Sequence, residues 1–66
     1  MKLKIDKETD ALYFRLDDKK IIDSEETSPG VILDYNENNE VVGIEILHLS
    51  RRTDKINLDS LFYETV

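Results

Sequence analysis

The sequence has no cysteine and only one histidine, His48, so two common supports for a small fold are missing. Without cysteine there is no disulfide and no thiolate ligand, and a structural zinc site normally takes four Cys or His ligands. Yet a chain of 66 residues buries only about 60% of the surface that it exposes when unfolded. Support for the fold must therefore come from a well-packed sheet, a homodimer or a partner chain.

Long apolar runs are absent as well. Charged and apolar residues alternate at the start of the chain, and the longest apolar candidate, 41–47, is interrupted by Gly43 and Glu45. A signal peptide needs an apolar stretch of about 7–15 residues, and a membrane helix needs about 20. We therefore expect a soluble cytoplasmic protein with one domain over residues 1–66 and no membrane partner. The lack of cysteine agrees with a reducing compartment.

Positive charge is missing from the middle of the chain. Residues 21–50 contain seven carboxylates and no Lys or Arg, whereas the segments on either side are nearly neutral. Because phosphate binding needs clustered Lys and Arg, this distribution predicts no direct nucleic-acid ligand. It favours a basic protein partner, although a solvated acidic surface that aids solubility is the simpler interpretation.

The apolar residues mostly alternate with polar ones, which is the period of a β-strand. The pattern predicts strands at residues 2–6, 11–16, 21–27, 31–35 and 41–47. The links between them are short and polar, so we expect neighbouring antiparallel strands and a β-meander of four to five strands. The segment 21–27 is the most polar of the five and is expected at an edge, where its carboxylates discourage aggregation.

Apolar side chains are expected on both faces of this sheet. The inner face is predicted from these residues: Leu12, Phe14, Leu16, Val31, Leu33, Val42, Ile44 and Ile46. The second face carries Tyr13, Ile32, Val41 and Leu47 among charges. An antiparallel sheet can leave one face wet, so we expect part of the second face to be covered. The C-terminal segment, a second subunit or another protein could cover it.

The C-terminal segment, 48–66, is expected to add a short helical element to the sheet, which gives an α+β fold that is mainly β. Residues 48–52 suit one helical turn, with Arg51 and Arg52 at its favourable C-terminal end. Asp59 or Ser60 could cap a second short helix, although Ile56 and Leu58 are also spaced like a strand. The apolar and aromatic residues of this tail either anchor a partner or pack back on the sheet; they are Leu58, Leu61, Phe62 and Tyr63.

No catalytic motif is found, and we predict no catalytic, metal or cofactor site. The pair Asp17 and Asp18 stands beside two lysines and is best interpreted as a solvated turn. A divalent cation could be held by carboxylates of residues 23–34, which are Asp23, Glu25, Glu26 and Asp34. The favoured interpretation of these residues is an acidic edge strand. His48 near Arg51 and Arg52 could act as a base beside a phosphate clamp, but a solvent-facing histidine is the simpler interpretation.

Four segments together resemble the DUF2283 family of small prokaryotic proteins. They are Lys4-Ile5-Asp6, Asp10-Ala11-Leu12-Tyr13-Phe14-Arg15-Leu16, Pro29-Gly30-Val31-Ile32-Leu33-Asp34-Tyr35 and Val42-Gly43-Ile44-Glu45-Ile46-Leu47. The resemblance covers residues 1 to about 50, and it implies a β-meander with a helical C-terminal element. It carries over no catalytic residue. Some members look like antitoxin partners of small RelE-like toxins. The sequence departs from the family at His48-Leu49, where relatives often have Asp-Ala, and in the tail after Arg52.

Two functions from different classes follow. The first is a protein–protein interaction module, most concretely the antitoxin of a basic RelE-like toxin, with Glu25 and Glu26 facing the basic surface and the tail as anchor. The second is a small-ligand or divalent-metal-binding domain that uses the carboxylates of residues 23–34 with His48. A homodimer of unknown role is a further alternative.

Overall fold

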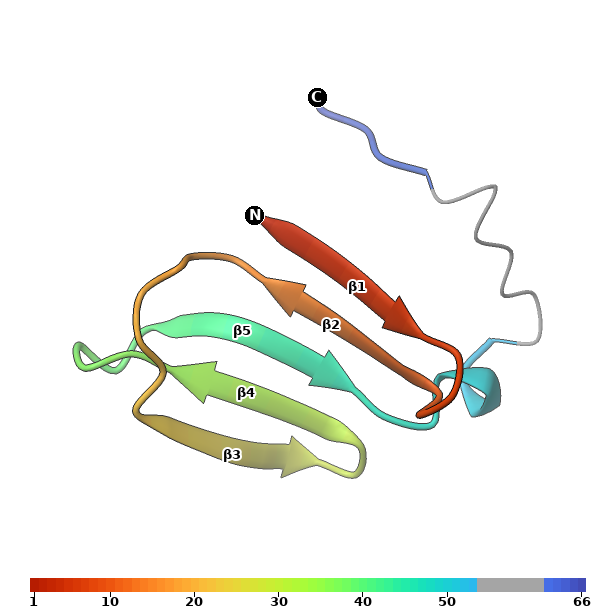
Figure 1. The fold of residues 1–66 in the computed structure, drawn as a ribbon, viewed down its shortest axis with the longest axis horizontal. Coiled ribbons are helices and arrows are strands. Elements are labelled where there is room, and N and C mark those ends of the chain that lie inside the picture. The colour runs from red at the N-terminus through yellow and green to blue at the C-terminus, as the bar shows by residue number, and fades with distance from the viewer. Residues whose placement is uncertain (54–61) are drawn as a thin grey trace.

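The strands form a single antiparallel sheet in the computed structural model, which describes residues 1–53 and 62–66 (Figure 1). The five strands are β1 (Lys2–Asp6), β2 (Ala11–Arg15), β3 (Asp23–Ser28), β4 (Val31–Tyr35) and β5 (Val41–Ile46). Their order across the sheet is β1-β2-β5-β4-β3, so β5 is the central strand and β1 and β3 are the edges. The predicted five-stranded antiparallel sheet, and the edge position of the third strand, are confirmed.

Three of the four strand pairs join strands that are consecutive in the chain, and the fourth joins strands that are far apart in the chain. β1–β2, β3–β4 and β4–β5 are consecutive in the chain and adjacent in the sheet, as in a meander. The fourth pair joins β2 to β5, with Leu12 opposite Ile46 and Phe14 opposite Ile44. Since β2 pairs with β5, the chain must cross from the β2 side of the sheet to its far edge before β3 begins.

Arg15, the last residue of β2, fixes the start of this crossing. Its Nε donates a hydrogen bond of 2.5 Å to the carbonyl of Asp17, and Nη2 donates to the carbonyl of Lys19. The planar guanidinium can bond two carbonyls at once because its donors form a rigid fork. At the far end, the amide of Ile22 donates to the carbonyl of Tyr35 (2.9 Å). The crossing segment is therefore tied to the sheet at both ends.

The β4–β5 turn is organised by one buried amide. Asn36 is only 2% exposed, and its Oδ1 accepts hydrogen bonds of 3.0 Å from the amides of Asn38 and Glu40. Its Nδ2 donates to Oε1 of Glu40 (3.0 Å). Asn39 has φ 61°, a left-handed conformation that asparagine tolerates. The Asn-rich loop that the sequence predicted is therefore a specific, internally bonded turn.

The prediction of a C-terminal helix is wrong for the residues that the structure describes. That part contains only a three-residue 3-10 turn, η1 (Leu49–Arg51), and no α-helix. The turn starts after His48, whose left-handed φ of 52° breaks with the extended chain of β5, and one more amide bond, from Arg52 to Leu49, closes it. Asp59, Ser60 and Leu61, on which the second helix depended, lie outside the described residues.

Of the eight residues predicted for the inner face only Val42 is buried, so this face is not a closed core. Ala11 (8% exposed) and Val42 (4%) are the buried hydrophobic residues among those described. Leu16 of the predicted inner face is 40% exposed. Period two correctly places apolar side chains on one face, but a single layer of sheet supplies nothing to bury them against.

No helix among the described residues has the length and apolar character needed to cross a membrane.

Candidate protein-binding surfaces

The acidic edge is formed by three carboxylates of β3: Asp23, Glu25 and Glu26. All six residues of this strand are exposed, and one side of it has no neighbouring strand. Glu25 lies opposite Leu33 and Glu26 opposite Ile32, so the two glutamates point to opposite faces. A partner that approached this edge would therefore meet negative charge above and below the strand, along with unpaired main-chain groups.

The predicted tail anchors are only partly within the described chain. Phe62 and Tyr63 are 81% and 79% exposed, so they are not packed on the sheet. Leu58 and Leu61 lie outside the described residues. In Figure 1 residues 62–66 lie on the β1 side of the sheet, at the other edge from β3. The structure therefore does not bring Phe62 and Tyr63 together with Glu25 and Glu26.

A continuous apolar face covers one side of the sheet. The strand register aligns its side chains in two rows: Ile5, Leu12, Ile46 and Val31 in one, and Leu3, Phe14, Ile44 and Leu33 in the other. None of the eight is buried, and Leu3 is 36% exposed. The second row ends at Glu25 on β3. An apolar surface that crosses every strand but one is unusual on an isolated small protein.

The opposite, polar face is held together around a buried carboxylate, that of Asp34. It is 7% exposed, and it accepts hydrogen bonds from the Tyr13 hydroxyl (2.8 Å) and the Ser24 hydroxyl (2.6 Å). Gly43 lies beneath this pair, and a Cβ there would stand 2.8 Å from both Asp34 Oδ2 and the Tyr13 oxygen. Gly43 therefore lies at a close approach of two side chains to the backbone, and the strand register shifts beside it, between Asp34 and Tyr35. No pattern in the sequence predicts the network of Asp34, Tyr13 and Ser24.

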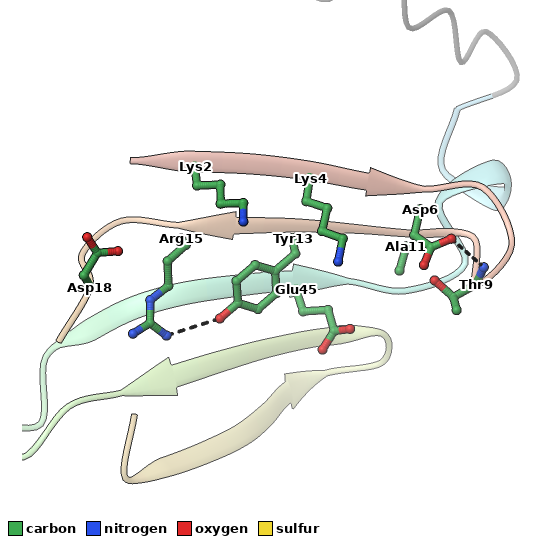
Figure 2. Close-up of a pocket in the computed structure, with 9 residues that line it drawn as sticks. All are labelled: Lys2, Lys4, Asp6, Thr9, Ala11, Tyr13, Arg15, Asp18 and Glu45. Carbon is green, nitrogen blue, oxygen red and sulfur yellow. Dashed lines mark hydrogen bonds between the residues drawn. The ribbon is translucent and has the colours of Figure 1, made fainter. Parts of the chain in front are cut away.

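An open hollow of about 570 Å³ lies over the β1–β2 half of the polar face (Figure 2). Lys2 and Lys4 of β1 project over it from one side, and Arg15 reaches the Tyr13 hydroxyl (3.4 Å). Three cations and three carboxylates line it: Lys2, Lys4, Arg15, Asp6, Asp18 and Glu45. Its positive and negative charges balance, so the lining gives no charge preference for an anion or a cation.

The carboxylates proposed for a cation do not gather. Asp23 and Glu25 point to the apolar face, Glu26 and Asp34 to the polar face, and Asp34 is already used by Tyr13 and Ser24. Residues 1–53 and 62–66 contain no group of three acidic, His or Cys side chains that could hold a metal ion. Alternation along one strand separates neighbouring side chains, which is why carboxylates close in sequence are not close in space.

His48 is exposed and lies in an open hollow with Glu26, Arg51 and Arg52. The Arg52 guanidinium donates to the carbonyl of Pro29 (2.8 Å), so it ties the end of the 3-10 turn to the β3–β4 turn. The amide of Leu47 also donates to the carbonyl of Gly30 (2.8 Å). Arg52 is thus engaged with main chain, which leaves the proposed phosphate clamp beside His48 incomplete.

Asp10 clamps η1 to the β1–β2 turn. Its carboxylate accepts hydrogen bonds from the Ser50 amide (3.0 Å) and the Ser50 hydroxyl (2.6 Å), and its carbonyl accepts one from Leu49 (2.9 Å). The Ser50 hydroxyl is the main cause that lowers the pKa of Asp10 below its ordinary value. This contact joins residues 40 positions apart.

The fold and its surfaces define a small antiparallel β protein, one sheet thick, with an acidic edge and an open apolar face. Within that class, residues 2–50 match the family described as "Protein of unknown function (DUF2283)", and the chain belongs to this family. The predicted resemblance is confirmed, and the match ends before Phe62 and Tyr63. None of the curated proteins and none of the solved structures compared with the chain matches it.

Proposed function

We propose that this chain is a non-catalytic protein-binding module of the cytoplasm, and that its partner is a small basic toxin of the RelE-like class, which it neutralises as an antitoxin. The observation that carries the proposal is the acidic edge: β3 is fully exposed, unpaired on one side and lined by three carboxylates. No Lys or Arg interrupts the sequence between residues 21 and 50. A ribonuclease that binds RNA needs a basic surface, and an acidic strand is complementary to it.

The mode of contact follows from the open edge. A strand or extended loop of the partner can pair with the free main-chain groups of β3, which is the β-augmentation seen in many peptide-binding domains. Asp23 and Glu25 then face the partner on one side of the added strand, and Glu26 faces it on the other. Phe62 and Tyr63, both largely exposed, supply aromatic anchors at a separate site.

Co-expression with the adjacent open reading frame tests the proposal. The neighbour is expected to arrest growth when it is expressed alone, and to co-purify with this chain when both are expressed. Association should be fast at low salt and should slow as salt screens the exposed charges. A neighbour that is neither toxic nor retained by this chain would remove the antitoxin assignment.

Matched charge variants locate the contact. Glu25→Gln with Glu26→Gln removes two charges from the acidic edge, and Glu8→Gln with Asp18→Asn removes two from exposed turns on the β1–β2 half of the sheet. We expect the β3 pair to lower the association rate about tenfold at low salt and the turn pair to change it little. Equal effects of the two pairs would mean that only the net charge matters, and not the edge.

A further inference from the structure

The apolar face needs a cover that is present whenever the protein folds. All eight side chains of its two rows keep exposed area, and the described hydrophobic core contains only Ala11 and Val42. A chain of this size is marginally stable even with a complete core. A cover that is available only in the presence of another gene product would leave the free chain without adequate apolar burial, whereas a second copy is always available.

We propose that a second copy of this chain covers the apolar face, so that two sheets pack face to face as a β-sandwich. The inference goes beyond the proposed function and does not depend on it. The two apolar rows lie on β1, β2, β5 and β4, whereas the proposed partner pairs with the outer edge of β3. Sheets in such sandwiches pack about 10 Å apart, with side chains of the two inner faces interdigitating. The rows led by Ile5 and Leu3 would supply that interior.

The size of the face suits a dimer. Five strands of five to six residues define a face of about 24 by 18 Å, from the usual spacings of strands and residues. When two such faces pack together, they lose on the order of 1,000–1,200 Å² of solvent-accessible area in total, once the unevenness of their side chains is included. This just clears the area of about 1,000 Å² that a specific interface needs, and the face is apolar across four of its five strands, as homodimer interfaces tend to be.

The charges at the two edges select the symmetry axis. β3 carries Asp23, Glu25 and Glu26, whereas β1 carries Lys2 and Lys4 with a single carboxylate, Asp6. A two-fold axis parallel to the strands places β3 of each copy over β1 of the other. An axis across the strands would stack the two acidic edges on each other. Asp23 and Glu25 point to the apolar face, whereas Lys2 and Lys4 point to the polar one. Because like charges repel, the axis parallel to the strands is favoured, since it keeps Asp23 and Glu25 of the two copies apart.

Sedimentation equilibrium of the full chain gives the first test. The monomer has a mass of 7.7 kDa, and we expect about twice that value at micromolar concentration and above. Ile44→Lys puts a charge at the centre of the apolar face, and Glu45→Lys puts the same residue on the opposite face of the same strand. Ile44→Lys should weaken the dimer at least 100-fold, and Glu45→Lys should leave the mass of the dimer unchanged.

Because Ile44→Lys could fail to fold, the unmodified chain supplies a second measurement. The melting temperature of a dimer rises with protein concentration by mass action, and that of a monomer does not. A monomeric mass at 100 µM with a melting temperature that is independent of concentration would overturn the proposal.

Because the chain has no cysteine, a single introduced cysteine can report what covers the apolar face. In Ile44→Cys the thiol should be protected from a maleimide at high protein concentration and become reactive on dilution, whereas in Glu45→Cys it should react at both concentrations. A monomer with residue 44 protected at every concentration would mean that the chain covers its own face. A monomer with residue 44 always reactive would mean that another protein covers it. Either result rejects the dimer.

A spin label attached through Thr27→Cys on β3 tests the axis. With the axis parallel to the strands, the two β3 strands are displaced by about four strand spacings, or roughly 19 Å, in addition to the separation of the sheets. With the axis across the strands they are stacked and separated by the sheets alone. A label-to-label distance that corresponds to stacked β3 strands would overturn the assigned axis.

Discussion

At the scale of residues, the polar face depends on Gly43, which has no side chain. The Tyr13 hydroxyl crosses the central strand to reach Asp34, and it passes over Gly43. A glycine inside a strand normally weakens it, but here the space above the backbone is occupied by an aromatic ring and a buried carboxylate. Asp34 also accepts from Ser24, so three strands besides β5 are joined at this point.

Gly43→Ala is therefore expected to destabilise the fold. The new Cβ would lie 2.8 Å from two oxygens that hydrogen-bond to each other, and relieving the contact must separate them. We expect a loss of about 1–3 kcal/mol in the free energy of unfolding, the usual cost of overpacking. Urea denaturation at a fixed protein concentration measures it. Glu45→Ala on the same strand is the control, with an expected change below about 0.5 kcal/mol; a loss no larger in Gly43→Ala would refute the close contact.

At the scale of elements, alternation of apolar and polar residues was enough to predict all five strands, because a strand's period is a local property. The β2–β5 pair was not predictable from short links, since it joins Phe14 to Ile44 across three intervening connections. At the C-terminus the local pattern predicted one helical turn over residues 48–52, and the 3-10 turn η1 lies there. No local pattern indicated that a distant residue, Asp10, holds it. Glu25 and Glu26 were predicted on an edge strand and lie there, but whether they bind a partner is a matter of contact that no local pattern encodes.

Ser50→Ala tests the link between η1 and the β1–β2 turn. It removes the hydroxyl that donates to Asp10 at 2.6 Å, and leaves the Ser50 and Leu49 amides as the remaining donors. We expect hydrogen exchange of those two amides to accelerate severalfold, and the pKa of Asp10 to rise toward its ordinary value in an NMR titration. Ser28→Ala, at the end of β3, should change neither. An unchanged Asp10 pKa in Ser50→Ala would contradict the clamp.

At the scale of the whole molecule, acid is expected to loosen the turns before the strands. Three carboxylates have pKa values below their ordinary ones, and each lies at a turn or its end. The main causes are the Thr9 amide for Asp6, the Ser50 hydroxyl for Asp10 and the Asn36 side-chain amide for Glu40. All three bonds favour the charged form, so all three carboxylates resist protonation in the folded state.

The sign of the pH dependence follows. A carboxyl group whose pKa is lower in the folded state stabilises the fold above its unfolded pKa, about 4, and this contribution is lost as pH falls through the lower folded value. We therefore expect a melting temperature that is nearly constant from pH 7 to 5 and falls below about pH 4, as followed by circular dichroism.

A variant that combines Asp6→Asn, Asp10→Asn and Glu40→Gln separates this cause from general charge repulsion. Acid neutralises every carboxylate and leaves nine Lys and Arg residues to repel one another, which destabilises any compact state. Repulsion among the Lys and Arg residues acts equally on the variant and on the unmodified chain. The stabilisation that the three turn carboxylates give to the fold, however, is absent from the variant already at neutral pH. The variant should be less stable at pH 7 and fall less steeply below pH 4. If its melting temperature falls as steeply as that of the unmodified chain, repulsion across the whole molecule, and not the turns, sets its acid sensitivity.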